Sequence, residues 1–174
     1  MSIELATPTF SNEQICAHRG ASGSYPENTR AAFDAAASVG AGWIETDIQC
    51  LADGELVIFH DDHLGRTASG SAKVTLLSWP DMAGLDIGGW KGDAFASERP
   101  LRCEDLIAWQ AETSDRPGIV WEVKCAITLR RWMPPLRPSP SDSQISVIIA
   151  VSSRASVAMS YLRSDPSCPK CPWR

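Results

Sequence analysis

Three short apolar runs constrain the fold most, because each of them leads into residues that can carry chemistry. The runs span residues 15–17, 56–59 and 119–123, and they lead to or enclose His18, His60 and Glu122 respectively. A fourth run, residues 43–50, carries Glu45 and Asp47 among apolar residues. Short apolar runs bounded by turn residues are typical of strands. We therefore predict four strands with polar side chains at or near their carboxyl ends.

Helical segments lie between these strands. Residues 30–39 are rich in alanine, Asn28 or Thr29 precedes them as an N-cap, and Gly40 follows them as a stop signal. A second helix is predicted over residues 101–112. The alternation of strand and helix indicates an α/β fold. In a parallel α/β barrel, polar residues at the carboxyl ends of strands form the active site.

The composition changes along the 174 residues, at about Cys125. Residues 1–125 hold 19 acidic and 9 basic residues, whereas residues 126–174 hold 2 acidic and 7 basic residues together with 7 of the 12 prolines. We predict an acidic globular part over residues 1–125 and a basic tail rich in proline and serine over residues 126–174. Within the tail, residues 146–151 are predicted as one more strand and residues 153–163 as one more helix.

Charge and hydropathy exclude several classes of protein. A net charge of -5 and a pI near 5.2 argue against nucleic acid as a partner. No run of 18 apolar residues is present, so no membrane-spanning segment is predicted. Residues 1–4 lack the basic start of a secretory signal, and we expect a cytoplasmic protein. The four single cysteines are expected to be small buried thiols, and Cys168 and Cys171 form a pair that lacks the second pair of ligands a zinc site needs.

Histidines at strand ends are candidate general acids and bases. The chain has three histidines: His18 follows the first predicted strand, His60 follows the third, and His63 comes three residues later. A histidine exchanges protons near neutral pH, so two of them at the ends of different strands suit acid–base chemistry. A satisfied surface or core histidine is the alternative for each, and we assign it to His63. Asp61 or Asp62 could orient the His60 ring, or serve only as turn residues.

Carboxylates on the strands are candidate metal ligands. Glu45 and Asp47 are two residues apart, so a strand places both on one face, where they repel each other unless a cation lies between them. Glu122 repeats the pattern, and Lys124 lies on the same face as an alternative ion-pair partner for it. Carboxylate oxygens are preferred ligands of Mg²⁺ and Ca²⁺. A solvated strand face is the other interpretation of Glu45 and Asp47.

Two cationic side chains complete the candidate set. Arg19 follows His18 and offers planar donors that match a phosphate, although a surface salt bridge is its alternative role. With Lys124 it would supply positive charge beside the carboxylates. Two histidines, three carboxylates and two cations at strand ends suit metal-assisted phosphoryl chemistry.

Five motifs in this order resemble the glycerophosphodiester phosphodiesterase family. They are Ala17-His18-Arg19-Gly20, Pro26-Glu27-Asn28-Thr29, Ile44-Glu45-Thr46-Asp47, His60-Asp61-Asp62-His63-Leu64-Gly65-Arg66-Thr67 and Trp121-Glu122-Val123-Lys124. Residues 69–100 also resemble the small insertion that these enzymes carry. The resemblance covers residues 13–125.

The resemblance implies a (β/α)8 barrel and a hydrolase that cleaves small glycerophosphodiesters to glycerol 3-phosphate and an alcohol. It implies that His18 and His60 are the general acid–base pair. Glu45, Asp47 and Glu122 would bind one divalent cation, Mg²⁺ or Ca²⁺. Arg19 and Lys124 would contact the phosphate, and Glu27 would brace the first loop. The attacking group is either the glycerol hydroxyl of the substrate or water.

The length and the tail depart from this family. A complete barrel needs about 200 residues or more, and the pattern cannot be followed past Lys124. We therefore expect a chain that is truncated or frameshifted after about residue 125 and holds only the N-terminal part of the barrel. The alternatives to an active enzyme are an inactive remnant of the family and a phospholipase-like relative that acts on lysophospholipid or sphingolipid.

Overall fold

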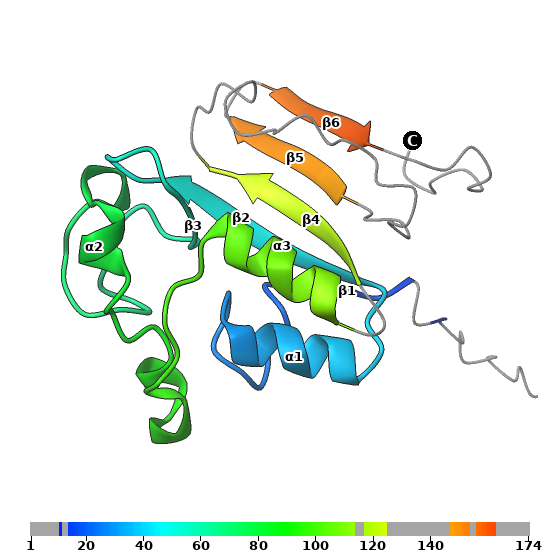
Figure 1. The fold of residues 1–174 in the computed structure, drawn as a ribbon, viewed down its shortest axis with the longest axis horizontal. Helices are drawn as coiled ribbons and strands as arrows, with labels where there is room; N and C mark the ends of the chain where they lie inside the picture. The colour runs from blue at the N-terminus through cyan, green and yellow to red at the C-terminus, as the bar shows by residue number, and fades with distance from the viewer. Residues whose placement is uncertain (1–10, 12–13, 114–116, 125–146, 154–155, 163–174) are drawn as a thin grey trace, which may run out of the picture.

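The computed structural model describes residue 11 and residues 14–113, 117–124, 147–153 and 156–162. A six-stranded sheet runs through these residues, with the strand order β1-β2-β4-β5-β6 and β3 paired to β2 (Figure 1). The strands are β1 (Cys16–His18), β2 (Trp43–Cys50), β3 (Leu56–Ile58), β4 (Gly118–Val123), β5 (Val147–Ser153) and β6 (Ser156–Leu162). The pairs β1–β2, β2–β4 and β4–β5 are parallel.

Two helices cover one face of the sheet (Figure 1). Helix α1 (Arg30–Ser38) begins where the Thr29 side chain accepts a hydrogen bond from the Ala32 N–H, so Thr29 is the N-cap of the two candidates. Helix α3 (Cys103–Glu112) follows the long segment that connects it to β3. The Phe33 ring of α1 and the Trp109 ring of α3 pack with their centroids 5.8 Å apart. The helices thus bury their apolar sides together against the sheet.

Strand alternation separates an apolar face from a polar one. On β2, Ile44 and Ile48 belong to the core beneath the helices, and on β4 Ile119, Trp121 and Val123 do the same. The residues between them, Glu45, Asp47 and Glu122, therefore lie on the opposite face. The predicted placement of both β2 carboxylates on one face is confirmed.

The segment between β3 and α3 forms a second, smaller core. It contains the short helix α2 (Trp79–Met82) and three 3-10 turns: η2 (Val74–Leu76), η3 (Gly89–Lys91) and η4 (Asp93–Phe95). Val57 and Phe59 from the β3 region pack there with Val74, Met82 and Ile87. This core supports the loop that begins at His60.

Two details of the prediction are wrong. Residues 153–163 were expected to be a helix, but β6 (Ser156–Leu162) pairs antiparallel with β5 over seven residues. The segment alternates Val157, Met159 and Tyr161, and pairing with β5 satisfies its backbone groups. Cys16 is exposed rather than buried, whereas Cys103 is buried and Cys50 is half-buried.

Several predictions lie outside the described residues. They concern Cys125, the segment 125–146, and the cysteine pair Cys168 and Cys171.

The described helices include none with the length and apolar character that a membrane crossing requires.

Candidate active site

Strand register brings four of the predicted residues together. In the parallel pairing of β1 with β2, His18 is opposite Glu45. In the pairing of β2 with β4, Asp47 is opposite Glu122. The register thus joins the end of β1 to the middle of β2 and to the end of β4 on the polar face of the sheet.

The antiparallel strand β3 brings His60 to the same place. One edge of β2 pairs with β4, so β1 and β3 share the other edge of β2. Strand β1 pairs with residues 43–45 of β2, and β3 pairs with residues 48–50 of β2. Because β1 is parallel to β2 and β3 is antiparallel, the two strands run toward each other. The Phe59 N–H continues the β3 pairing by donating to the Asp47 carbonyl oxygen at 3.0 Å. His18 and His60 therefore follow strands that converge on the segment from Glu45 to Asp47.

Glu45, Asp47 and Glu122 form a compact carboxylate cluster. One oxygen from each lies within 4.8 Å of the others. The buried Glu45 Oε1 has no hydrogen-bond partner among the described residues. Burial and then the neighbouring Asp47 charge raise the pKa of Glu45 to about 7. A buried acceptor without a donor, in a set of hard oxygen ligands, fits a divalent cation.

Lys124 bridges two members of this cluster. Its Nζ lies 2.6 Å from Glu122 Oε1 and 3.1 Å from Asp47 Oδ1. Burial alone would lower the pKa of Lys124, but the hydrogen bonds to Glu122 and Asp47 outweigh it and raise that pKa. The predicted ion pair with Glu122 is therefore present, and Asp47 shares it.

Arg19 lies on the other side of Asp47. Its Nε is 3.2 Å from Asp47 Oδ2, and its Nη1 donates to Glu27 Oε1 at 2.8 Å. The backbone N–H of Arg19 is within reach of both the Glu45 carbonyl oxygen, at 2.9 Å, and Glu45 Oε2, at 3.1 Å. Its φ of 57° is unusual for a residue with a side chain. The two cations flank Asp47, whereas no lysine or arginine among the described residues forms an ion pair with Glu45.

The two histidines differ in their surroundings. The His18 side chain is 66% exposed, and its Nε2 lies 3.8 Å from Glu45 Oε2. The His60 side chain is 30% exposed, and its Nδ1 lies 2.6 Å from Asp61 Oδ1. Asp61 is thus the residue that contacts the ring, whereas Asp62 and His63 are exposed. Of the two predicted alternatives, orientation of the imidazole is the one that the geometry of Asp61 supports.

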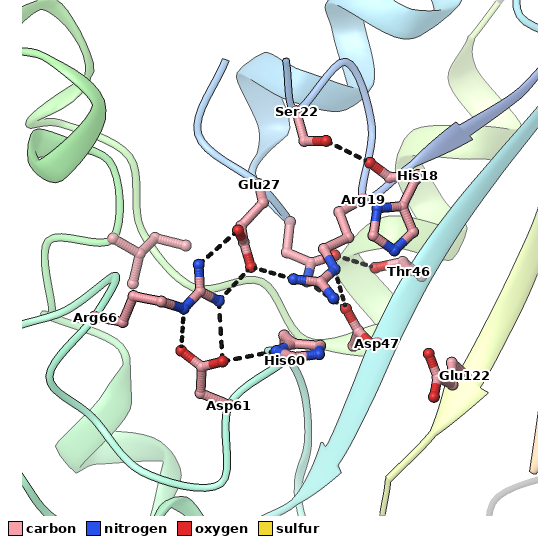
Figure 2. Close-up of polar contacts among 12 residues, drawn as sticks. His18, Arg19, Ser22, Glu27, Thr46, Asp47, His60, Asp61, Arg66 and Glu122 are labelled. Carbon is pink, nitrogen blue, oxygen red and sulfur yellow. Dashed lines mark hydrogen bonds and ion pairs between the residues drawn. The ribbon is translucent and has the colours of Figure 1, made fainter. Parts of the chain in front are cut away.

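The predictions missed three residues that organise the site. Asn28 donates to Asp47 Oδ2 at 2.9 Å and accepts from Thr46 Oγ1 at 2.8 Å, although the sequence suggested it only as a cap. Gln49 is buried and its Nε2 lies 3.2 Å from the carbonyl oxygen of His60. Arg66 contacts both Glu27 and Asp61 (Figure 2). The position of Gln49 two residues after Asp47, on the same strand face, was the available signal.

Comparisons with known proteins place this geometry in a family. The model of the glycerophosphoryl diester phosphodiesterase family matches residues 18–132. The chain belongs to this family. A glycerophosphodiester phosphodiesterase of Caldanaerobacter subterraneus is 44% identical over 85 residues, which are 49% of this chain and 35% of that relative.

Solved structures of the family share the fold. A phosphodiesterase of Oleispira antarctica, solved in complex with sn-glycerol-3-phosphate, is 36% identical with a TM-score of 0.60, over 64% of this chain and 44% of that one. A glycerophosphodiester phosphodiesterase of Agrobacterium tumefaciens is 38% identical with a TM-score of 0.57, over 63% and 46%. The predicted TIM-barrel class is confirmed, with the described residues forming part of such a barrel. The chain spans less than half the length of these relatives.

Proposed function

We propose that this chain is a cation-dependent glycerophosphodiester phosphodiesterase that releases glycerol 3-phosphate and an alcohol. The observation that carries the proposal is the convergence of β1 and β3 on β2. Together with the pairing of β2 and β4, it brings two histidines, three carboxylates and two cations to one face of the sheet. Membership of the family supports the reaction, and the relative in complex with sn-glycerol-3-phosphate supports a small phosphate ester as the ligand.

Glu45, Asp47 and Glu122 would hold one Mg²⁺ or Ca²⁺. When bound, the ion would neutralise negative charge on the phosphate oxygens. Lys124 and Arg19 already lie against this carboxylate cluster, so their donors are placed to contact a phosphate bound beside it. Three carboxylates and two cationic side chains leave one negative charge, which suits a dipositive ion and an anionic substrate.

His18 and His60 would carry the protons. One imidazole takes the proton of the attacking hydroxyl as its oxygen bonds to phosphorus. The other gives a proton to the departing alcohol oxygen as its bond to phosphorus breaks. Because Asp61 contacts Nδ1 of His60, Nε2 is the nitrogen left to exchange a proton with substrate. If the attacking group is the glycerol hydroxyl of the substrate, a cyclic phosphate forms first, whereas water gives glycerol 3-phosphate directly.

The substrate class can be tested with a panel of esters. Glycerophosphocholine and glycerophosphoethanolamine are incubated with the full chain and Mg²⁺ or Ca²⁺, and glycerol 3-phosphate is measured. We expect release that a chelator abolishes and that added cation restores. Lysophosphatidylcholine and sphingomyelin form a second arm of the panel. Turnover in that arm alone would replace the proposed substrate class with that of the phospholipase-like alternative.

An inactive remnant of the family is the alternative to this proposal. Residues equivalent to more than half of each matched structure are not part of the match. A remnant would bind the cation through the carboxylate cluster but would turn over none of the four substrates. The division at about residue 125 and a cytoplasmic location both stay predictions.

A further inference from the structure

A chain of charged contacts connects the loop after β1 with the loop after β3. Arg66 lies at its centre and uses three nitrogens (Figure 2). Toward Asp61, Nε donates to Oδ2 at 2.8 Å and Nη2 donates to Oδ1 at 2.9 Å. Toward Glu27, Nη1 donates to Oε2 at 2.8 Å and Nη2 donates to Oε1 at 2.7 Å. The guanidinium therefore makes a bidentate contact with each of the two carboxylates.

Each of these carboxylates also contacts a residue of the proposed mechanism. Asp61 Oδ1 is shared by Arg66 and His60 Nδ1, and Glu27 Oε1 is shared by Arg66 and Arg19 Nη1. The Arg66 contacts to Glu27 span 39 positions of sequence. One planar side chain thus connects a proposed proton carrier to a proposed phosphate ligand.

We infer that Arg66 is a positioning residue that fixes His60 through Asp61 and Arg19 through Glu27. The inference rests on the proposed function, which gives His60 and Arg19 their roles. By holding Asp61 in place as an acceptor, Arg66 keeps the hydrogen of the neutral His60 ring on Nδ1 and leaves Nε2 free. By holding Glu27, it keeps the Arg19 guanidinium beside Asp47.

The chemistry of the side chain explains why arginine is needed. A guanidinium presents donors in a fixed plane that matches two carboxylates at once, whereas an ammonium is a compact point charge. Arg66→Lys therefore keeps the charge but loses one of the two bidentate contacts. Arg66→Met removes charge and contacts while retaining an unbranched apolar stem. Arg30→Met is a matched control, because Arg30 pairs with Asp34 on the exposed side of α1.

Kinetic constants separate the contacts that reach His60 through Asp61 from those that reach Arg19 through Glu27. We expect Arg66→Met to lower kcat/KM by about 10- to 100-fold, as removal of a residue that orients a catalytic group does. The loss should appear in both kcat and KM. Asp61→Asn should act mainly on kcat, through His60, and Glu27→Gln mainly on KM, through Arg19. Arg66→Lys should recover only part of the loss, and Arg30→Met should match the unmodified chain.

A spectroscopic readout tests the inference without turnover. The chain has only three histidines, so ring nitrogens labelled with ¹⁵N can be assigned by single substitutions. At about pH 8, where an ordinary histidine is neutral, the unmodified chain should show the Nδ1–H tautomer at His60. Arg66→Met should shift this ring toward a mixture of tautomers, whereas Arg30→Met should not.

The result that overturns the inference is an Arg66→Met variant whose His60 tautomer and kinetic constants equal those of Arg30→Met. Failure of the proposed function has a different signature. It would be the absence of turnover in the unmodified chain, and the His60 tautomer in Arg66→Met would still decide the role of Arg66.

Discussion

The raised pKa of Glu45 should make binding of the proposed cation depend on pH. Burial and the nearby Asp47 charge hold this pKa at about 7, so about half of the Glu45 carboxyls carry a proton at neutral pH, and a bound cation would displace it. A group with that pKa is about one-tenth ionised at about pH 6 and nine-tenths ionised at about pH 8. We therefore predict that the dissociation constant for Mg²⁺ falls about tenfold between these two pH values.

Titration calorimetry measures this effect directly. At about pH 7, in buffers of different ionisation enthalpy, binding should release about half a proton per ion. Glu45→Gln should weaken binding and remove the pH dependence together. Glu104→Gln is the matched control, because Glu104 is an exposed carboxylate that pairs with Arg102. An affinity that is equal at both pH values, or a Glu45→Gln variant that binds like the control, would refute this reasoning.

The same pKa affects the stability of the cation-free chain. A carboxyl whose pKa is higher in the folded chain than in the unfolded chain binds its proton more tightly when folded. Its contribution is present in full below its unfolded pKa of about 4.3 and is lost as the pH rises through about 7. The free energy of unfolding should therefore fall from about pH 5 to about pH 8, and less so in Glu45→Gln.

Three substitutions test the scaffold around the site. Gln49→Leu removes donors to the carbonyls of the loop after β3 and should cost about 1–3 kcal/mol in urea unfolding. Its kcat should fall more than its KM changes. Phe33→Ala leaves a cavity in the core beneath α1 and should lower the free energy of unfolding by about 3–5 kcal/mol in the same assay. Gly20→Ala, with φ at 79° and a Cβ that would lie 2.8 Å from Ala32, should destabilise the chain and raise KM, whereas Gly23→Ala has open space and should do neither.

Local signals predicted the parts of the fold that depend on local chemistry. The alanine-rich segment after Thr29 became α1, and the two-residue spacing of Glu45 and Asp47 placed both on the polar face. These outcomes follow from helix capping and from the period of a strand. The family motifs then located His18, His60 and Glu122 near one another.

Contacts between residues that are far apart in the sequence could not be predicted from the sequence alone. Nothing in a single sequence shows that Arg66 reaches Glu27 across 39 positions, or that Lys124 divides its contacts between Glu122 and Asp47. The segment 153–163 shows the same limit, because its apolar residues fit both helix and strand spacing. Its pairing with β5 decided the outcome.

The central claim is that His18 and His60 act together on a phosphodiester at the β2 carboxylates. The most direct measurement is the initial rate of glycerol 3-phosphate release from glycerophosphocholine in His18→Ala, His60→Ala and His63→Ala variants, each with saturating Mg²⁺. We predict that the first two lose about 10²- to 10⁴-fold in rate, and that His63→Ala, whose side chain is exposed, keeps the full rate. Equal rates in all three variants, or an unmodified chain that releases no glycerol 3-phosphate, would contradict the claim.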